Sequence, residues 1–227
     1  MAEQPENHIN IDRDAMREVV RHPQAHGLVL GQYRVGEYAG VVGLRRLLGE
    51  MQPEGKLHQA MTIHYQDEGR HSQVFTEWIE RLGMQPDVLP TEVEGYFSRS
   101  PEEFQQQRQM LDALPPEIRR IAVFAAINAV ERGAYNQFEA HLSVLDRKSD
   151  RDELERVMRE ERFHLSYVEH ELERQADGPL ANVVSLALEQ AQTRFEEFRL
   201  ARQNDIRIAI ERTLGGGVAS TPEGDRP

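Results

Sequence analysis

Residues 67–71, DEGRH, and residues 160–167, EERFHLSY, share one short pattern: a glutamate followed three residues later by a histidine. In the first stretch the pair is Glu68 and His71. Positions three apart on an α-helix lie on one face, about one turn from each other, so both side chains can reach a common ligand. A chain this rich in glutamate would contain about one such pair by chance, so the wider spacing has to decide whether the pattern has meaning.

Two lone glutamates extend the pattern. Glu37 lies 31 residues before Glu68, and Glu131 lies 30 residues before Glu161, which is the glutamate of the second pair. The two intervals are nearly equal, so both halves of the chain carry one arrangement. In each half a single glutamate is followed, about 30 residues later, by Glu-x-x-His.

Each interval is interrupted near its midpoint by residues that end helices. Residues 52–55, QPEG, combine proline with glycine, and residues 146–150, DRKSD, break the second helical run. Arms of about 15 residues on either side of a turn extend ~22 Å at 1.5 Å per residue. Folding back at these turns brings the lone glutamate level with the Glu-x-x-His pair. The sequence therefore predicts two antiparallel helical hairpins of one design.

The rest of the chain is also expected to be helical, because strong helix formers are abundant and alternating β-branched runs are scarce. We expect helices over 12–21, 28–51, 56–82, 102–112, 117–145, 151–175 and 180–213. Residues 84–115 are rich in proline and are interpreted as a crossover between the hairpins. The predicted fold class is all-α, a four-helix bundle with one long crossover and additional N- and C-terminal helices. An α-solenoid would need a repeat of roughly 33–47 residues, and none is found.

Length and composition set the domain prediction. The chain has 227 residues, of which 39% are hydrophobic, and this fits one core. We expect a single helical domain over residues 1–214, with its core bundle at about 28–175, and a disordered tail over 215–227.

Charge and cysteine content exclude several classes of protein. The net charge of −12 makes nucleic-acid binding unlikely as a function, because such proteins gather lysine and arginine against phosphates. The absence of cysteine excludes disulfides, cysteine nucleophiles and iron–sulfur clusters ligated by this chain. No stretch is apolar enough to predict a membrane span, and the first residues do not resemble a secretion signal, so we expect a cytoplasmic location.

Four glutamates and two histidines in the centre of a bundle are the ligand set of a two-metal carboxylate site. The predicted ligands are Glu37, Glu68, His71, Glu131, Glu161 and His164. Four carboxylates neutralise two divalent ions, and oxygen and imidazole donors suit iron or manganese, with zinc an alternative. We therefore expect two iron ions, or manganese or a mixed pair in their place.

Neighbouring residues are candidates for holding these ligands. An acidic residue beside each pair can accept the free ring N–H of a ligand histidine. The candidates are Asp67, Glu160, Arg70, Arg162, Tyr65 and Tyr135. The alternative is that the charged residues lie on solvent faces and that the tyrosines only pack in the core.

His64 and two glycines also fall close to the predicted ligands. His64, four residues before Glu68, is either an extra ligand or proton relay, or, as we favour from sequence, an ordinary core or surface histidine. Gly36 and Gly40 flank Glu37. They indicate either close helix packing or, as we expect, a cavity for dioxygen and a small substrate.

At these residues the chain resembles the ferritin-like di-iron carboxylate superfamily, which includes rubrerythrins, aldehyde-deformylating oxygenases, tRNA hydroxylases of this fold and, more distantly, ribonucleotide reductase small subunits. The resemblance covers about residues 28–175 and does not select a subfamily. It implies a ferritin-like bundle and metal-ligand roles for the six glutamates and histidines named above. It leaves the substrate and the catalytic residues open.

The function expected from the site and the resemblance is a non-haem di-iron oxidoreductase with O₂ as co-substrate and a small, partly apolar organic substrate. Electrons would come from an external donor, a reductase or a ferredoxin, because the chain has neither a cysteine-ligated centre nor a dinucleotide fingerprint. A homodimer is compatible with the sequence. The first alternative is a ferroxidase or peroxide-scavenging protein. The second is a non-catalytic helical interaction module whose glutamates and histidines lie on solvent faces.

Overall fold

The computed structural model describes residues 13–87 and 101–215, and every regular element in these ranges is an α-helix. The helices are α1 (Arg13–Arg21), α2 (Pro23–Met51), α3 (Gly55–Arg81), α4 (Pro101–Asp112), α5 (Pro116–Leu142), α6 (Lys148–Ala176) and α7 (Ala181–Gly215). The predicted all-α class is confirmed for these residues. Among the described helices, none is both long and apolar enough to cross a bilayer.

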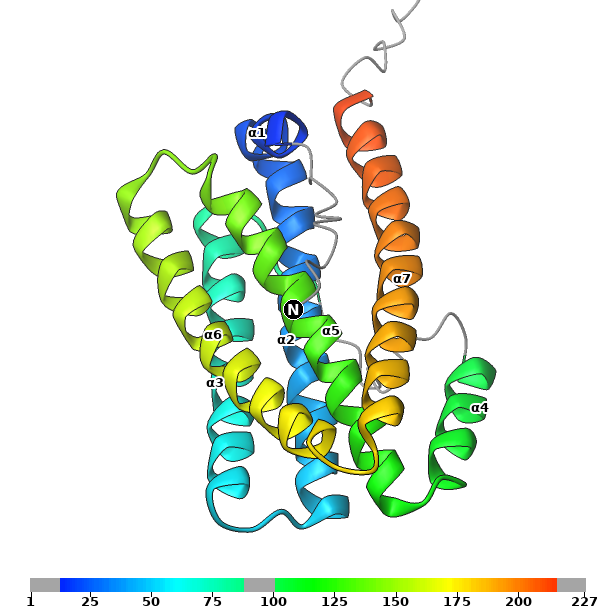
Figure 1. Ribbon diagram of the computed structural model, residues 1–227. Coiled ribbons are helices and arrows are strands. Elements are labelled where there is room, and N and C mark those ends of the chain that lie inside the picture. Colours follow the sequence, from blue (N-terminus) through cyan, green and yellow to red (C-terminus); the bar gives the residue numbers. More distant parts are fainter. Residues whose placement is uncertain (1–12, 88–100, 216–227) are drawn as a thin grey trace, which may run out of the picture.

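Two pairs of long helices fold back on each other (Figure 1). Helix α2 packs along α3, and α5 packs along α6. The first turn contains Gln52, whose backbone is left-handed with φ of 42°, and is followed by Gly55 with φ of 59°. The second turn falls at residues 143–147, slightly earlier than the sequence indicates. Both predicted hairpins are therefore present.

The two hairpins meet directly on one side and through a fifth helix on the other. Helix α3 packs against α6, whereas α7 packs on both α2 and α5 and covers the opening between them (Figure 1). Helix α1 packs across α2 and α5, and α4 contacts α5. The C-terminal helix, expected as an addition outside the core, is thus a wall of the molecule's interior.

Several predicted boundaries need correction. Helix α2 begins at Pro23 and not near residue 28, because proline fits the first turn of a helix, where its missing N–H has no partner to lose. Gly83, with φ of 76°, lies just beyond the end of α3, as expected for a left-handed cap. Residues 88–100 of the predicted crossover, and 216–227 of the predicted tail, lie outside the described residues. The single-domain prediction stays a prediction.

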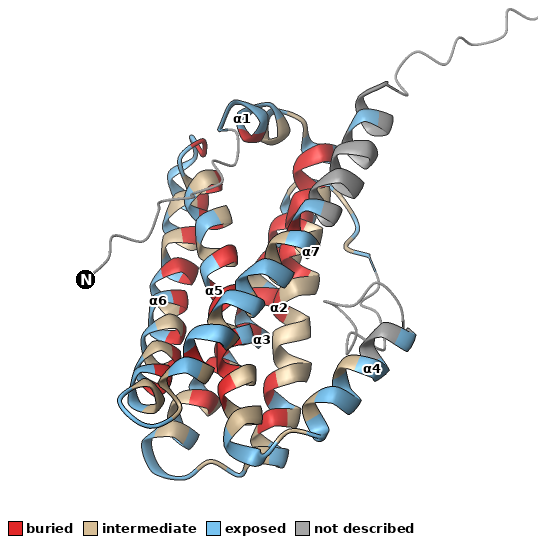
Figure 2. Ribbon diagram, turned by 45° about the vertical axis from the view of Figure 1, so that its right-hand side comes forward, coloured by how far each residue is buried: buried red, intermediate tan, exposed pale blue. Residues whose placement is uncertain are grey.

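Apolar side chains form two clusters, one toward each end of the long helices. Figure 2 shows that buried residues recur along these helices. The first contains Phe75, Trp78 and Phe138, and the second contains Met61 and Phe124, all of them almost completely buried. Each such side chain contributes roughly 1.5–3 kcal/mol when it is removed from water. On every long helix of the two hairpins, the predicted ligands fall between the residues of these two clusters. The clusters therefore fix the helices on both sides of a buried polar layer.

Candidate metal centre

The six predicted ligands come from four helices and meet in this polar layer. Helix α2 supplies Glu37 and α5 supplies Glu131, while α3 and α6 each supply a Glu-x-x-His pair. None of the six is more than 6% exposed. Such burial is rare for ionisable residues, which enter a protein interior only when they are paired, hydrogen-bonded or bound to a metal.

The donors form two overlapping groups that share Glu68. One group is Glu37, Glu68, His71 and Glu161, and the other is His64, Glu68, Glu131 and His164. Within each group, one ligand atom from every residue lies within 4.8 Å of the others. The structure therefore brings all six predicted ligands together and adds His64. Their role as metal ligands stays a prediction.

In the first group a single ring nitrogen faces two carboxylates. Nδ1 of His71 lies 3.1 Å from Oε2 of Glu37 and 3.0 Å from Oε1 of Glu161. Within the described part of the chain, Oε1 of Glu161 is buried without a partner of hydrogen-bond geometry. Three groups that converge in this way, a ring nitrogen and two carboxylate oxygens, have the arrangement of ligands around a cation.

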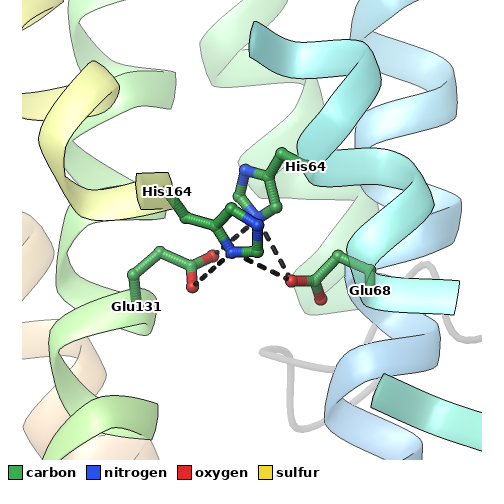
Figure 3. Close-up of side chains that lie close together, drawn as sticks. All are labelled: His64, Glu68, Glu131 and His164. Atoms are coloured by element: carbon green, nitrogen blue, oxygen red, sulfur yellow. Dashed lines mark hydrogen bonds and ion pairs between the residues drawn. The ribbon is translucent and has the colours of Figure 1, made fainter. Parts of the chain in front are cut away.

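The second group contains two stacked imidazoles (Figure 3). The rings of His64 and His164 lie 3.7 Å apart at an angle of 17°. Nε2 of His64 is 3.1 Å from both Oε1 of Glu68 and Oε1 of Glu131. Nδ1 of His164 is 3.7 Å from Glu68 and 3.9 Å from Glu131. The two rings therefore present nitrogen atoms to the same pair of carboxylates.

The outward nitrogens of the two predicted ligand histidines are held by acids of the opposite hairpin. Nε2 of His71 donates to Oε2 of Glu160 at 2.8 Å, and Nε2 of His164 donates to Oδ2 of Asp67 at 3.2 Å. Arg70 joins both acids, at 2.6 Å from Asp67 and 3.0 Å from Glu160. These contacts fix which ring nitrogen carries the proton and turn the other nitrogen toward the carboxylate cluster. The structure places these three residues where their predicted roles require.

Three other predicted neighbours do not take the expected positions. Arg162 is exposed, and its Nε and Nη2 donate to the hydroxyl of Tyr135 at 2.9 and 2.6 Å. Because Arg162 directly follows Glu161, its side chain leaves the helix about 100° away from the ligand face. Tyr65 packs against the apolar cluster that contains Met61 and Phe124. In the part of the chain that the structure describes, no hydrogen bond or ion pair joins Arg162, Tyr135 or Tyr65 to the predicted ligands, as in the alternative in which these residues face solvent or pack in the core.

The electrostatics of the cluster favour a positive charge at its centre. Burial, together with the nearby Glu68 and Glu161, raises the pKa of Glu37 well above its ordinary value. Burial and Glu131 likewise raise the pKa of Glu161. Glu37 and Glu161 therefore resist ionisation beside their neighbours, as expected for like charges in a poorly solvated site. Burial also opposes ionisation of Glu131, but the contacts with His64 and His164 hold the pKa of Glu131 well below its ordinary value.

The histidines respond in the opposite direction. Burial opposes protonation of His64, but Glu131 and Glu68 outweigh it and raise its pKa to about 9. Burial also opposes protonation of His164, yet Asp67 and the two glutamates Glu131 and Glu161 raise its pKa to about 12. Protons thus collect on the imidazoles to balance the carboxylates. Metal ions that bind here would displace them, so metal binding would release protons.

Glycines give the carboxylates and a neighbouring helix their room. A Cβ atom at Gly40 would overlap Oε2 of Glu68, so a side chain there would move that carboxylate. A Cβ atom at Gly133 would overlap the ring of Phe195 in α7. Gly40 thus supports the site directly, while Gly133 permits the close approach of α7.

A cavity of about 110 Å³ adjoins the cluster between α2 and α5, beneath α7. Its walls include Glu37, Glu68 and Glu131, together with Gly36 and Gly40. The cavity that the glycines beside Glu37 indicate is therefore present. A second cavity of about 300 Å³ lies between α3 and α6, where Arg70, His71 and Glu160 are among the lining residues.

Two features of the site were not predicted as such. His64 was favoured as an ordinary histidine, although its spacing of four before Glu68 is the signal that places it on the ligand face. Its Nδ1 lies 2.7 Å from the hydroxyl of Tyr167, which fixes the ring. The contribution of α7 to the cavity, through Phe195 and Arg199, has no signal in the sequence because spacing does not show which helices pack together.

Comparison with known protein families, with curated proteins and with solved structures finds no match for this chain. The function of the protein is therefore inferred from the geometry of the site.

Proposed function

We propose that this chain is a ferritin-like di-metal carboxylate oxidoreductase that uses two iron ions, or manganese or a mixed pair, to activate O₂ and oxidise a small, partly apolar organic substrate. The observation that carries the proposal is the pair of buried donor groups that share Glu68. Two helical hairpins connected by a long segment, with these donors between them, are also what a ferritin-like four-helix bundle with one crossover would contain.

The donor set fits a pair of divalent cations. Carboxylate oxygens and imidazole nitrogens suit iron, manganese or zinc, and four glutamates balance the charge of two divalent ions. The unsatisfied Oε1 of Glu161, described above, and the raised pKa of Glu37 are both relieved by a cation at the centre of the cluster. Without one, the buried carboxylates would repel each other or take up protons.

The two groups assign the ligands of each ion. Glu37 and His71 would hold one ion, and Glu131, His164 and His64 would hold the other. Glu68 belongs to both groups, and Glu161 lies 3.0 Å from both His71 and His164, so these two carboxylates are within reach of either ion. When bound, the two metal ions would supply reducing electrons and a binding site for O₂. Asp67 and Glu160 orient the rings of His164 and His71, and Arg70 balances the charge of these two acids.

The cavity under α7 supports an organic substrate. It joins the ligand carboxylates to an apolar wall that includes Phe138, Phe195 and Phe198. Aromatic walls exclude water and bind apolar groups, which is typical of small-molecule sites. A ferroxidase or peroxide-scavenging protein, whose substrate is an ion or a small polar molecule, has no need of such a wall. The interaction-module alternative assumed side chains on solvent faces, and the burial of all six removes that premise.

The proposal also covers the electron donor, the oligomeric state and the location of the protein. A reductase or ferredoxin would provide electrons, because the chain has no cysteine to ligate a redox centre of its own. We also propose a homodimer and a cytoplasmic location.

Oxygen consumption tests the proposal. The protein, loaded with Fe²⁺ without oxygen and supplied with a chemical reductant, should consume O₂ repeatedly when aldehydes, amines, aromatic compounds or organic acids are added. A ferroxidase would instead consume O₂ in proportion to the Fe²⁺ and reductant supplied, at the same rate with and without an organic compound. The variant Glu131→Gln should lose turnover, while Glu139→Gln, an exposed glutamate of the same helix, should retain it. Equal activity of these two variants would contradict the proposed site.

A further inference from the structure

Arg199 of α7 is a buried cation with two donor groups left open. Its side chain is 6% exposed, and Nε donates to Oε2 of Glu196 at 2.8 Å. Among the described residues, neither Nη1 nor Nη2 has a hydrogen-bond partner. Arginine remains charged in proteins, and burying its donors unpaired is strongly unfavourable. Within the described part of the chain, the two terminal nitrogens of Arg199 therefore have no hydrogen-bond acceptor.

Tyr33, another residue that lines the same cavity, has an unsatisfied hydrogen-bond donor. The hydroxyl of Tyr33 on α2 is buried and, in the described ranges, has no hydrogen-bond partner. Both Tyr33 and Arg199 belong to the cavity that reaches Glu37. Buried polar groups in folded proteins are nearly always paired, so two open donors in one cavity indicate a ligand with acceptor atoms.

The charge around Arg199 defines the ligand further. Glu196 engages only Nε and is itself 30% exposed. Two divalent ions would neutralise the four cluster glutamates, which then have no charge left to balance Arg199. The edge of the guanidinium that carries Nη1 and Nη2 is suited to a bidentate anion, a carboxylate or a phosphate.

Cavity size and walls select between these anions. The volume of about 110 Å³ is smaller than a cavity of roughly 150 Å³ that holds benzene in another protein. Phe138, Phe195 and Val130 contribute apolar surface to it. A compact carboxylic acid with an apolar body matches both the walls and the guanidinium, whereas free phosphate leaves the aromatic surface uncovered.

We propose that this cavity binds a small carboxylic acid, with its carboxylate on Nη1 and Nη2 of Arg199 and its apolar body against Phe138 and Phe195, extending toward Glu37. The hydroxyl of Tyr33 donates to a polar atom of the same molecule. This assignment deepens the proposed function, on which its role as a substrate site rests, and names the substrate class: short-chain carboxylic acids.

Calorimetric titration of the full chain tests the anion site. The probes are propanoate and butanoate, each paired with its neutral amide, and inorganic phosphate. At least one acid should bind roughly 10- to 100-fold more tightly than its amide, because a hydrogen-bonded ion pair replaces a neutral contact. Equal affinity of both acids and their amides would overturn the proposal, and so would a preference for phosphate over both acids.

Variants separate the role of Arg199 from a structural one. Arg199→Gln should lose acid binding by about the same factor, and Arg199→Lys should lose less, because lysine keeps the charge without the fork of two donors. Arg194→Gln, an exposed arginine of the same helix, should bind as the parent does. Unchanged acid affinity in Arg199→Gln would overturn the assignment. If that variant fails to fold, the acid and amide comparison in the parent still decides.

Metal analysis of the same samples separates the two proposals. If the parent binds two metal ions and shows no preference for acids, the carboxylate site fails and the di-metal function stands. If acids bind through Arg199 and the protein binds no metal, the proposed function fails while the anion site stands. To exclude direct ligation of the acid by metal, the titration is repeated with metal-loaded Arg199→Gln protein, where the preference for the acid over its amide should be lost.

Discussion

Nε2 of His71 in α3 donates to Oε2 of Glu160 in α6 at 2.8 Å, so a histidine of one hairpin is held by a carboxylate of the other. His164 and Asp67 repeat the relationship in the opposite direction, from α6 to α3. Each hairpin thus orients a predicted ligand of its partner. The cluster can therefore form only when both hairpins are packed together, and damage to one hairpin should affect the ligands of both.

The first prediction concerns Glu160, which orients His71. Glu160→Ala removes the acceptor, and the metal affinity should fall roughly 10- to 100-fold. Glu160→Gln keeps an acceptor but loses the charge, so its affinity should lie between those of the parent and the alanine variant. Competition with a chelator measures the affinities, and Glu173→Gln, an exposed position of the same helix, is the control. A parental affinity in Glu160→Ala would show that this hydrogen bond does not position the ring.

Gly40 offers a test that leaves every ligand in place. Gly40→Ala adds a Cβ that overlaps Oε2 of Glu68, the residue shared by both donor groups, so metal binding should fall sharply. Gly43→Ala on the same helix meets no atom within 4 Å and should keep full metal binding. It should also stabilise the protein by up to about 1 kcal/mol, because alanine is the better helix former. Equal metal content in the two variants would contradict the position of Glu68.

Glu37 should show opposite effects on stability and on metal binding. Burial together with Glu68 and Glu161 raises the pKa of Glu37, so this residue destabilises the metal-free protein at any pH above the ordinary pKa of a glutamate. Glu37→Gln removes this penalty and should raise the melting temperature of metal-free protein by roughly 2–4 °C if the gain is of the order of 1 kcal/mol. The same change should weaken metal binding. A lower melting temperature without metal would show that Glu37 is stabilised by its neighbours.

A buried pair of histidines outside the cluster predicts how stability depends on pH. Nε2 of His26 and Nε2 of His141 lie 2.9 Å apart, so one ring donates to the other and both are neutral. Burial lowers the pKa of His26 to about 4, and burial together with His26 lowers the pKa of His141 to about 3. In the unfolded chain both titrate near 6.5. Between these values the unfolded state binds more protons, so stability falls as the pH drops from about 6.5 toward 4.

Urea unfolding at pH 7 and pH 5 measures this effect. Each neutral histidine should account for roughly 1–2 kcal/mol of the loss at pH 5. His141→Gln should reduce the difference between the two pH values by about that amount, whereas His58→Gln, at an exposed position, should not change it. The cluster histidines are unchanged in both variants and cancel in the comparison. Identical pH dependence in His141→Gln and the parent would show that His141 does not stay neutral.

The sequence predicted the parts of this structure that depend on spacing along one chain. Equal intervals and central breakers placed Glu37 beside Glu68 and Glu131 beside Glu161, because helix rise and turn position fix that register. It could not predict that Asp67 holds His164 and not His71, since this depends on how the hairpins pack. It also missed the placement of α7 over the cavity. Arg199 lies on a helix of mixed polarity, and only tertiary packing shows which face of that helix is buried.

Metal stoichiometry tests the central claim most directly. The purified protein, equilibrated with Fe²⁺ without oxygen and passed through a desalting column, is analysed for metal per chain. The two donor groups predict two ions for the parent and for Glu139→Gln, and one ion or none for Glu131→Ala. A parent protein that retains no metal, or a Glu131→Ala variant that still retains two ions, would contradict the assignment of this cluster as a di-metal site.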